Sequence, residues 1–234
     1  MATRRSYNDA CGTGHALDLV GERWALLVVR ELLLGPKRYG QLRSDLPGIS
    51  TNVLAQRLTE LEASGLVRKQ RLPAPAVTEA YELTAWGREL EPVVRALGRW
   101  ALRSPQHDRT AHLSATSFIL GLRTNFDPGR AQGVQGRYEL HINAEVFRVV
   151  IADGILHAER GHQQDPDAVI TAQPSALARV VYGGRTLADA ITEGDVQVEG
   201  DIASIARLAA VLTLPAPAPS ATRGTQSPEL KNPQ

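Results

Sequence analysis

The chain has 234 residues, of which 43% are hydrophobic, and its formal net charge is +1. That length and apolar content suit one or two domains with packed cores. The single cysteine, Cys11, excludes an internal disulfide. No secretory leader or membrane-length apolar span is visible, so we expect a cytoplasmic protein with no membrane partner.

The charge is divided unevenly along the chain. Residues 1–109 hold 16 Lys and Arg against 12 Asp and Glu, whereas residues 110–234 hold 10 against 13. A mildly basic first half and an acidic second half fit one module that faces phosphate joined to another that avoids it.

The first predicted helix begins near Cys11 and continues through His15–Leu19. At the start of a helix, the dipole and the charge of Arg4 or Arg5 could stabilise a thiolate, which makes Cys11 a candidate redox sensor. A plain buried cysteine is the alternative.

The next segment, Trp24–Leu34, is apolar apart from Arg30 and Glu31 and ends at a Gly-Pro pair, which predicts a core helix. Lys37 and Arg38 then open another helix. Basic side chains at a helix N-terminus commonly contact the phosphate backbone. A solvated loop is the alternative for these two residues.

A short amphipathic helix is predicted over Tyr39–Leu46, and the Pro-Gly pair after it provides the tight turn of a helix-turn-helix. The following stretch, Ile49–Gly65, has leucines at i, i+4 and i+7 on one face and an N-cap hydroxyl from Ser50 or Thr51. Its other face, flanked by Arg57, carries hydrogen-bonding side chains suited to base edges: Asn52, Gln56, Thr59 and Glu60. Taken alone, such a helix is more often an ordinary surface helix.

Two β-rich runs come next, Leu66–Leu72 and Val77–Leu83, joined by the sequence PAPA. They predict a hairpin whose basic side chains lie beside the preceding helix: Arg68, Lys69 and Arg71. Helix, turn, helix and basic hairpin in this order indicate a winged helix.

This predicted domain supplies the candidate DNA contacts. For the major groove the candidates are Ser50, Thr51, Asn52, Gln56 and Arg57. For phosphate or wing contacts the candidates are Lys37, Arg38, Arg43, Lys69 and Arg71.

Thr84–Arg103 is predicted as a long helix with apolar residues at helical spacing, which Pro92 bends or restarts. A winged helix is too small to cover this apolar stripe alone, so we expect the stripe to meet the N-terminal helices of a second copy. A two-fold homodimer would present two recognition helices to a pseudo-palindromic site in double-stranded DNA.

A dense set of motifs runs through residues 8–104: Cys11, the GERW-LL-REL block, the LPGIS segment, the QRL-ELE-GLV helix and the YELT-GREL-PV stretch. It closely resembles the HxlR-type winged helix-turn-helix regulators of bacteria. The resemblance implies a dimeric transcription factor, usually a repressor, that binds operator DNA and sometimes senses oxidants through a cysteine near the position of Cys11. Pro73 and Pro75 at the wing tip depart from the pattern, which bears on how the wing enters the minor groove.

Residues 104–111 are polar and without periodicity, and mark a domain boundary. Leu113–Asn125 predicts a helix, and beyond Gly136 the period falls to two over three strands with an Asp-Gly hairpin signal. This pattern predicts an α+β domain with an antiparallel sheet and several helices. Its remaining elements are expected at Ala168–Ala172, Pro174–Tyr182, Leu187–Thr192, Val196–Val198 and Ile202–Leu214.

Over residues 112–214, the helix opened by Pro174, the Gly183-Gly184 pair and the segment GDVQVEGD resemble a sterol carrier protein-like domain. The resemblance implies an apolar tunnel that binds lipids or other hydrophobic molecules. Plain core packing is the alternative for the candidate pocket residues, which are Phe118, Leu122, Phe147, Val149, Val180 and Tyr182.

Three parts are therefore expected: a winged-helix DNA-binding and dimerisation domain over residues 1–105, a sterol carrier-like ligand-binding domain over residues 112–214, and a disordered Pro-, Ser- and Ala-rich tail over residues 215–234.

Enzyme chemistry finds little support in the sequence. No GxSxG, P-loop, GxGxxG or HExxH motif is present, so we expect no catalytic residue and no cofactor. His157 and His162 lack a nearby third ligand in sequence, and we expect no metal site.

The sequence thus predicts a homodimeric DNA-binding regulator, with repression as the expected sign and a hydrophobic small molecule in the second domain as the expected effector. Two alternatives stay open. One is a redox-sensing regulator that acts through Cys11 and has a structural second domain. The other is a lipid-binding carrier protein whose winged helix mediates protein contacts.

Overall fold

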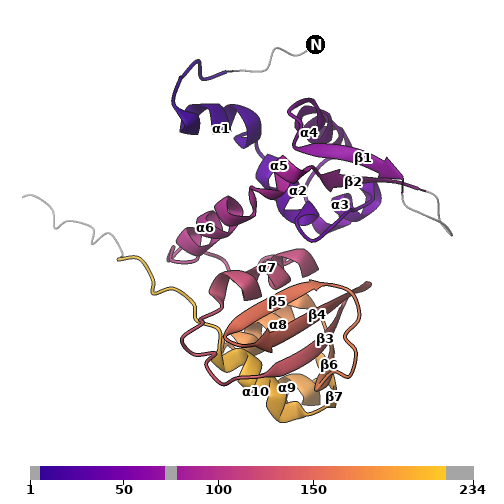
Figure 1. Cartoon of the computed structure of the whole chain (residues 1–234), viewed down its shortest axis with the longest axis vertical. Helices are drawn as coiled ribbons and strands as arrows, with labels where there is room; N and C mark the ends of the chain where they lie inside the picture. The colour runs from indigo at the N-terminus through magenta and orange to yellow at the C-terminus, as the bar shows by residue number, and fades with distance from the viewer. Residues whose placement is uncertain (1–5, 72–77, 220–234) are drawn as a thin grey trace, which may run out of the picture.

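The computed structural model describes residues 6–71 and 78–219. Its N-terminal half consists of helices and a β-hairpin (Figure 1). The bounds are α1 Gly12–Val20, α2 Ala25–Leu32, α3 Tyr39–Asp45, α4 Thr51–Ala63, β1 Val67–Arg71, β2 Glu79–Leu83, α5 Ala85–Arg88 and α6 Glu91–Ala101. This order confirms the predicted winged helix. The wing tip, with the PAPA segment that holds Pro73 and Pro75, lies outside the described residues.

The recognition helix α4 is fixed by its apolar face and by its N-cap. The three leucines predicted to point inward, Leu54, Leu58 and Leu61, are each at most 1% exposed. The Ser50 hydroxyl accepts a hydrogen bond from the main-chain N–H of Val53 at 3.3 Å, as expected of an N-cap. These two constraints set which side of α4 remains free.

The predicted long helix over Thr84–Arg103 is two helices in the structure. α5 ends at Arg88 and α6 begins at Glu91, with Pro92 in the first turn of α6. Proline is favoured in a first turn because its missing N–H would have no partner there, so Pro92 marks a restart. None of the residues of α6 is buried in this single chain.

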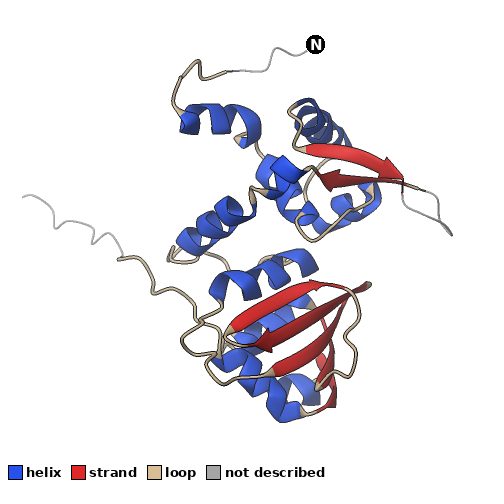
Figure 2. Ribbon diagram, viewed as in Figure 1, coloured by secondary structure: helices blue, strands red, loops and turns tan. Residues whose placement is uncertain are grey.

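The C-terminal half combines helices with one five-stranded sheet (Figure 2). The sheet order is β5-β4-β3-β6-β7. The bounds are α7 Ala115–Asn125, β3 Gly136–Ile142, β4 Glu145–Ala152, β5 Ile155–Arg160, β6 Ala168–Ala172, α8 Pro174–Val181, α9 Leu187–Thr192, β7 Val196–Gly200 and α10 Ile202–Ala210.

The predicted antiparallel sheet needs one correction. β3, β4 and β5 form the expected antiparallel meander, but β6 pairs with β3 in parallel, so the sheet is mixed. The reason is topological. After β5 the chain crosses to the other edge of β3, where β6 runs in the same direction as β3. A parallel pair needs such a crossover connection, because a short hairpin can join only antiparallel neighbours.

The predicted tail also needs a correction at its start. The N–H of Ala218 donates to the main-chain oxygen of Arg103 at 2.7 Å, and Nε of Arg103 donates to the main-chain oxygen of Ala216 at 3.1 Å. Residues 216–218 are therefore held against the segment that follows α6. The rest of the expected tail, from Ser220 onward, lies outside the described residues.

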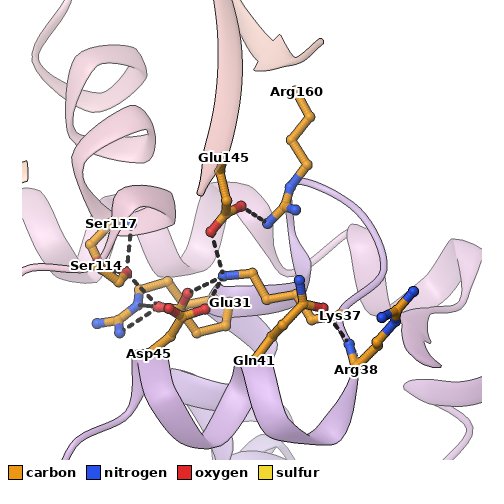
Figure 3. A network of polar contacts seen from close by, with 10 residues as sticks. Glu31, Lys37, Arg38, Gln41, Asp45, Ser114, Ser117, Glu145 and Arg160 are labelled. Atoms are coloured by element: carbon orange, nitrogen blue, oxygen red, sulfur yellow. Dashed lines mark hydrogen bonds and ion pairs between the residues drawn. The ribbon is translucent and has the colours of Figure 1, made fainter. Parts of the chain in front are cut away.

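A buried ionic network joins the two halves (Figure 3). Lys37 is 1% exposed, and its Nζ lies 2.8 Å from Glu31 of α2 and 2.5 Å from Asp45 of α3. Glu145 lies at the start of β4 in the second domain. Its Oε1 is 3.7 Å from Lys37 Nζ, and its Oε2 is 2.5 Å from Nη2 of Arg160. One lysine thus connects two helices of the winged helix to the sheet of the second domain.

Glu31 is ionised at the centre of this network. Burial opposes its ionisation, but the charges of Arg30 and Lys37, with hydrogen bonds from Lys37 and from the Ser114 hydroxyl, hold the pKa of Glu31 below its ordinary value. The stability contributed by Glu31 is therefore present above the ordinary glutamate pKa and is lost as the pH falls through the lower, folded value.

Replacing Lys37 with Met should lower the free energy of unfolding by about 3–5 kcal/mol, because buried carboxylates would lose their counter-charge. Lys69→Met is the matched control. Lys69 is exposed on β1, so its loss should change the free energy of unfolding by no more than about 0.5 kcal/mol. Urea denaturation followed by circular dichroism measures both variants. Equal stability of the two variants would contradict this account of the junction.

Candidate nucleic-acid interface

The first two turns of α4 present a polar, exposed surface. Ser50, Thr51, Asn52 and Gln56 are all exposed, although Ser50 also serves as the N-cap. The Tyr39 hydroxyl donates to the main-chain oxygen of Thr51 at 2.7 Å and so fixes the start of α4 against α3. In Figure 1, α4 and the hairpin lie at the end of the molecule away from the five-stranded sheet. Four of the five predicted major-groove residues therefore share one accessible surface.

Arg57, the fifth, does not belong to that surface. Its side chain is 8% exposed, and Nη1 lies 3.2 Å from a Glu22 carboxylate oxygen and 3.0 Å from one of Glu60. The helical position of Arg57 borders the leucine face, so its aliphatic stem is drawn into the core and its charge is neutralised by acids of the same domain. The prediction that Arg57 reads a groove is wrong for this conformation.

Exposed cationic side chains lie on the two elements that contact α4, which are α3 and β1. Arg38 and Arg43 are exposed at the two ends of α3, and Lys69 and Arg71 are exposed two residues apart on β1. No ion pair neutralises these four within residues 6–71 and 78–219. Arg68, between α4 and Lys69 in sequence, is by contrast paired with Glu82 at 2.6 Å. The four unpaired cations can attract phosphate.

Lys37 needs a correction for a different reason. It was expected at a phosphate, but it is 1% exposed and surrounded by carboxylates. The signal in the sequence was Glu31, a carboxylate within an otherwise apolar helix. A buried carboxylate requires a buried cation, and Lys37 is that cation.

The candidate pocket residues are mostly core. Phe118, Leu122, Phe147 and Val149 are each at most 1% exposed, whereas Val180 and Tyr182 are half-buried against the same cluster. Burial and a hydrogen bond involving Asn125 act oppositely on Tyr182, and burial wins, raising its pKa to about 12. None of the six borders the cavity between α6, α7 and β5 that the described residues form. Plain packing accounts for their positions.

Cys11 occupies the N-cap position of α1 and is exposed. The main-chain N–H groups of Thr13 and Gly14, followed by the Thr13 hydroxyl, favour the thiolate at this helix start and lower the pKa of the thiol. The expected position at a helix start is confirmed, and the buried-cysteine alternative is wrong. Arg4 and Arg5 lie outside the described residues.

No helix in the described part of the chain is long and apolar enough to cross a membrane.

Two known families match the chain, one over each structural half. Residues 19–108 match the model of the HxlR-like helix-turn-helix family. Residues 104–218 match a model described as the alkyl sulfatase C-terminal family, which replaces the expected sterol carrier protein-like domain.

Curated relatives match the first half. A helix-turn-helix transcriptional regulator of Synechocystis is 42% identical over 87 residues, which span 37% of this chain and 64% of that relative. The transcriptional regulator YodB of Bacillus subtilis is 40% identical over 86 residues, which span 37% of this chain and 77% of YodB.

Solved structures resemble each half separately. The reduced form of YodB has 37% identity and a TM-score of 0.36, and the match covers 40% of this chain and 92% of YodB. The sec-alkylsulfatase Pisa1 of Pseudomonas has 18% identity and a TM-score of 0.43, and the match covers 45% of this chain and 17% of the sulfatase. Two curated regulators of Bacillus subtilis are at least 37% identical to this chain, and the matches cover 80% of YvaP and 77% of YodB. The chain belongs to the HxlR-like helix-turn-helix family of transcriptional regulators.

Proposed function

We propose that this chain is a homodimeric repressor that binds a pseudo-palindromic operator through α4 and its hairpin. The observation that carries the proposal is the division of α4 into two faces. Its leucines are buried, while Asn52 and Gln56 are exposed beside four unpaired cations. Amide side chains can form bidentate hydrogen bonds with adenine in the major groove, and the cations can hold the helix against the phosphates. A protein with this task works in the cytoplasm.

The proposed dimer rests on α6. Val93, Leu97 and Trp100 are 53%, 48% and 71% exposed, and they recur at the spacing of one helical face. Leu17 of α1 is also 43% exposed. Exposed apolar side chains at helical spacing favour a partner helix, and the proposed partner surface is α1 and α6 of a second copy. A two-fold axis there would set the distance between the two α4 helices.

The second domain has a regulatory role in this proposal. It contacts the winged helix through Glu145, which pairs with Lys37 near the start of α3. It also contacts α6, because Arg123 of α7 pairs with Glu91 at 2.8 Å. A change in the second domain can therefore reach both the DNA-binding helices and the proposed dimer helix. Half-sites must match the operator spacing, so a small rotation of α6 is enough to weaken binding.

A second candidate function is favoured by Cys11. An exposed thiol with a lowered pKa forms a thiolate more readily and reacts faster with oxidants and electrophiles. In this version the modified Cys11 would displace α1 and so disturb the dimer, and the second domain would be structural.

Gln56→Ala should weaken binding to an operator by about 1–3 kcal/mol, because the amide would no longer reach a base edge. Gln164→Ala, the same change at an exposed position of the second domain, is the control and should bind as the unchanged protein does. The measurement is fluorescence anisotropy with DNA from upstream of the protein's own gene, and with further genomic fragments, against scrambled competitor over a salt series. If both variants bound equally to every specific fragment, α4 would not be the reading helix.

Leu97→Arg should convert the dimer to monomers, because it would bury an unpaired charge in the proposed interface. Ile202→Arg on α10 is the control, because Ile202 is 53% exposed and Leu97 is 48% exposed. Sedimentation velocity measures the mass of each. A dimer that survives Leu97→Arg, or a protein that is monomeric without any change, would exclude this interface.

Alkylation of Cys11 by iodoacetamide should have its pH midpoint below that of free cysteine, because the thiol pKa is lowered. The chain has one cysteine, so mass spectrometry reports this site alone. Cys11→Ser should then abolish any loss of DNA binding caused by peroxide. A midpoint at or above that of free cysteine, or an unchanged peroxide response in the variant, removes the second candidate.

A further inference from the structure

A cavity of about 450 Å³ lies where α6 of the winged helix meets α7 and β5 of the second domain. This volume is within the range of small-molecule sites and is too small for a macromolecule. The cavity does not include the residues predicted to bind a ligand, and it is bordered by both halves of the chain. Any occupant would therefore contact the joint between them.

The cavity has an apolar part and a charged part. The apolar part comes from Phe126 after α7 and from Ile155 and Leu156 of β5. The polar part comes from Arg95 of α6 and Arg123 of α7, and Glu91, His157 and Glu159 line the cavity as well. A ligand that fills this space must offer an apolar body and a polar end.

Most of the charges are already satisfied within the protein. Glu91 accepts from Arg123 Nη1 at 2.8 Å, and Glu159 accepts from Arg148 at 2.7 Å. The remaining nitrogens of Arg123 donate to the main-chain oxygen of Ala158 at 2.8 and 2.5 Å. Each of the two glutamates already has an arginine partner, and every nitrogen of Arg123 already donates one hydrogen bond.

Arg95 differs from Arg123. One of its terminal nitrogens donates to the main-chain oxygen of Arg123, and the other lies 3.8 Å from Glu91. Its Nε is buried and has no hydrogen-bond partner among the described residues. A buried donor on a charged group that lacks an acceptor is costly. The Arg95 side chain as a whole is 37% exposed, so a ligand oxygen in the cavity can approach its guanidinium, and a small rotation of that group would give Nε an acceptor as well. A carboxylate is the acceptor that binds a guanidinium best.

We propose that this cavity binds a small apolar carboxylic acid, with its carboxylate on Arg95 and its aromatic or alkyl body against Phe126 and Leu156. As a regulatory site it rests on the proposed function, because the occupant would press on α6, whose outer face carries the exposed Leu97 and Trp100. The binding itself does not depend on DNA. The proposed site differs from the expected tunnel inside the second domain in its location, its lining residues and its requirement for an anion.

The experiment uses the full chain and isothermal titration calorimetry without DNA, with three acids as probes: naphthoate, phenylpropionate and decanoate. Naphthalene methanol serves as the neutral counterpart of naphthoate. At least one acid should bind the unchanged protein, and naphthoate should bind about tenfold more tightly than the alcohol, because the bond to a charged donor favours it. Failure of all three acids to bind at millimolar concentration would overturn the proposal.

Two variants separate the Arg95 contact from the packing of α6 on α7. Arg95→Met should weaken the binding of the acids by about tenfold and leave the alcohol unchanged. Arg99→Met is the matched control, since Arg99 also lies on α6 and donates to α7, at 2.9 Å from the main-chain oxygen of Thr124, but does not border the cavity. It should keep the affinity of the unchanged protein. Equal effects of the two variants would mean that the interhelical hydrogen bonds matter and the cavity does not.

Leu156→Trp should fill the cavity and block all four probes, and circular dichroism checks that this variant folds. Because binding is measured without DNA, failure of the operator experiment would leave this result standing. If an acid binds through Arg95 but changes neither operator affinity nor dimer mass, the site exists and its regulatory role is wrong.

Discussion

The ionic network at Lys37 is the interaction on which the arrangement of this molecule depends. Two charges that are almost fully removed from water, Lys37 and Glu31, are tolerable only because each has a partner at hydrogen-bond distance. The main chain of Lys37 also exchanges hydrogen bonds with Tyr81 of β2, at 3.0 and 2.9 Å. The same residue therefore fixes α2, α3 and the wing to one another, and through Glu145 it ties them to the second domain. The winged helix and the second domain are coupled through this residue.

This constraint separates the charges that hold the protein together from those that are free for DNA. Lys37 and Arg57 were candidates for DNA by sequence, yet both are buried and paired with carboxylates. Arg38, the N-cap of α3, and Arg43, in its last turn, remain exposed, although Leu42 of the same helix is buried. Charge alone did not distinguish the two groups. Burial distinguishes the structural cations from the exposed ones. A cation near an apolar helix face is drawn to an acid within its own domain, whereas a cation on the opposite face has only solvent and DNA as partners.

Local patterns predicted most of the fold. The leucines of α4, the Ser50 N-cap and the restart at Pro92 follow from helical periodicity and capping, which act over a few residues. The parallel pairing of β6 with β3 was missed because strand order depends on contacts that are distant in sequence. The junction was missed for the same reason, although Glu31 in an apolar helix indicated that a buried cation was needed. The cavity at Arg95 had no sequence signal, since it is formed by two domains meeting.

In the proposed dimer, α4 of each subunit reads one half of a symmetric operator. The most direct measurement is selection of bound fragments from sheared genomic DNA by the purified full chain, followed by sequencing and footprinting of the enriched fragments. We expect an inverted repeat with half-sites about one helical turn apart, or a multiple of that spacing, and protection on both halves. Fragments that share no motif and bind with a salt dependence identical to that of random DNA would contradict it, because only phosphate attraction would then remain.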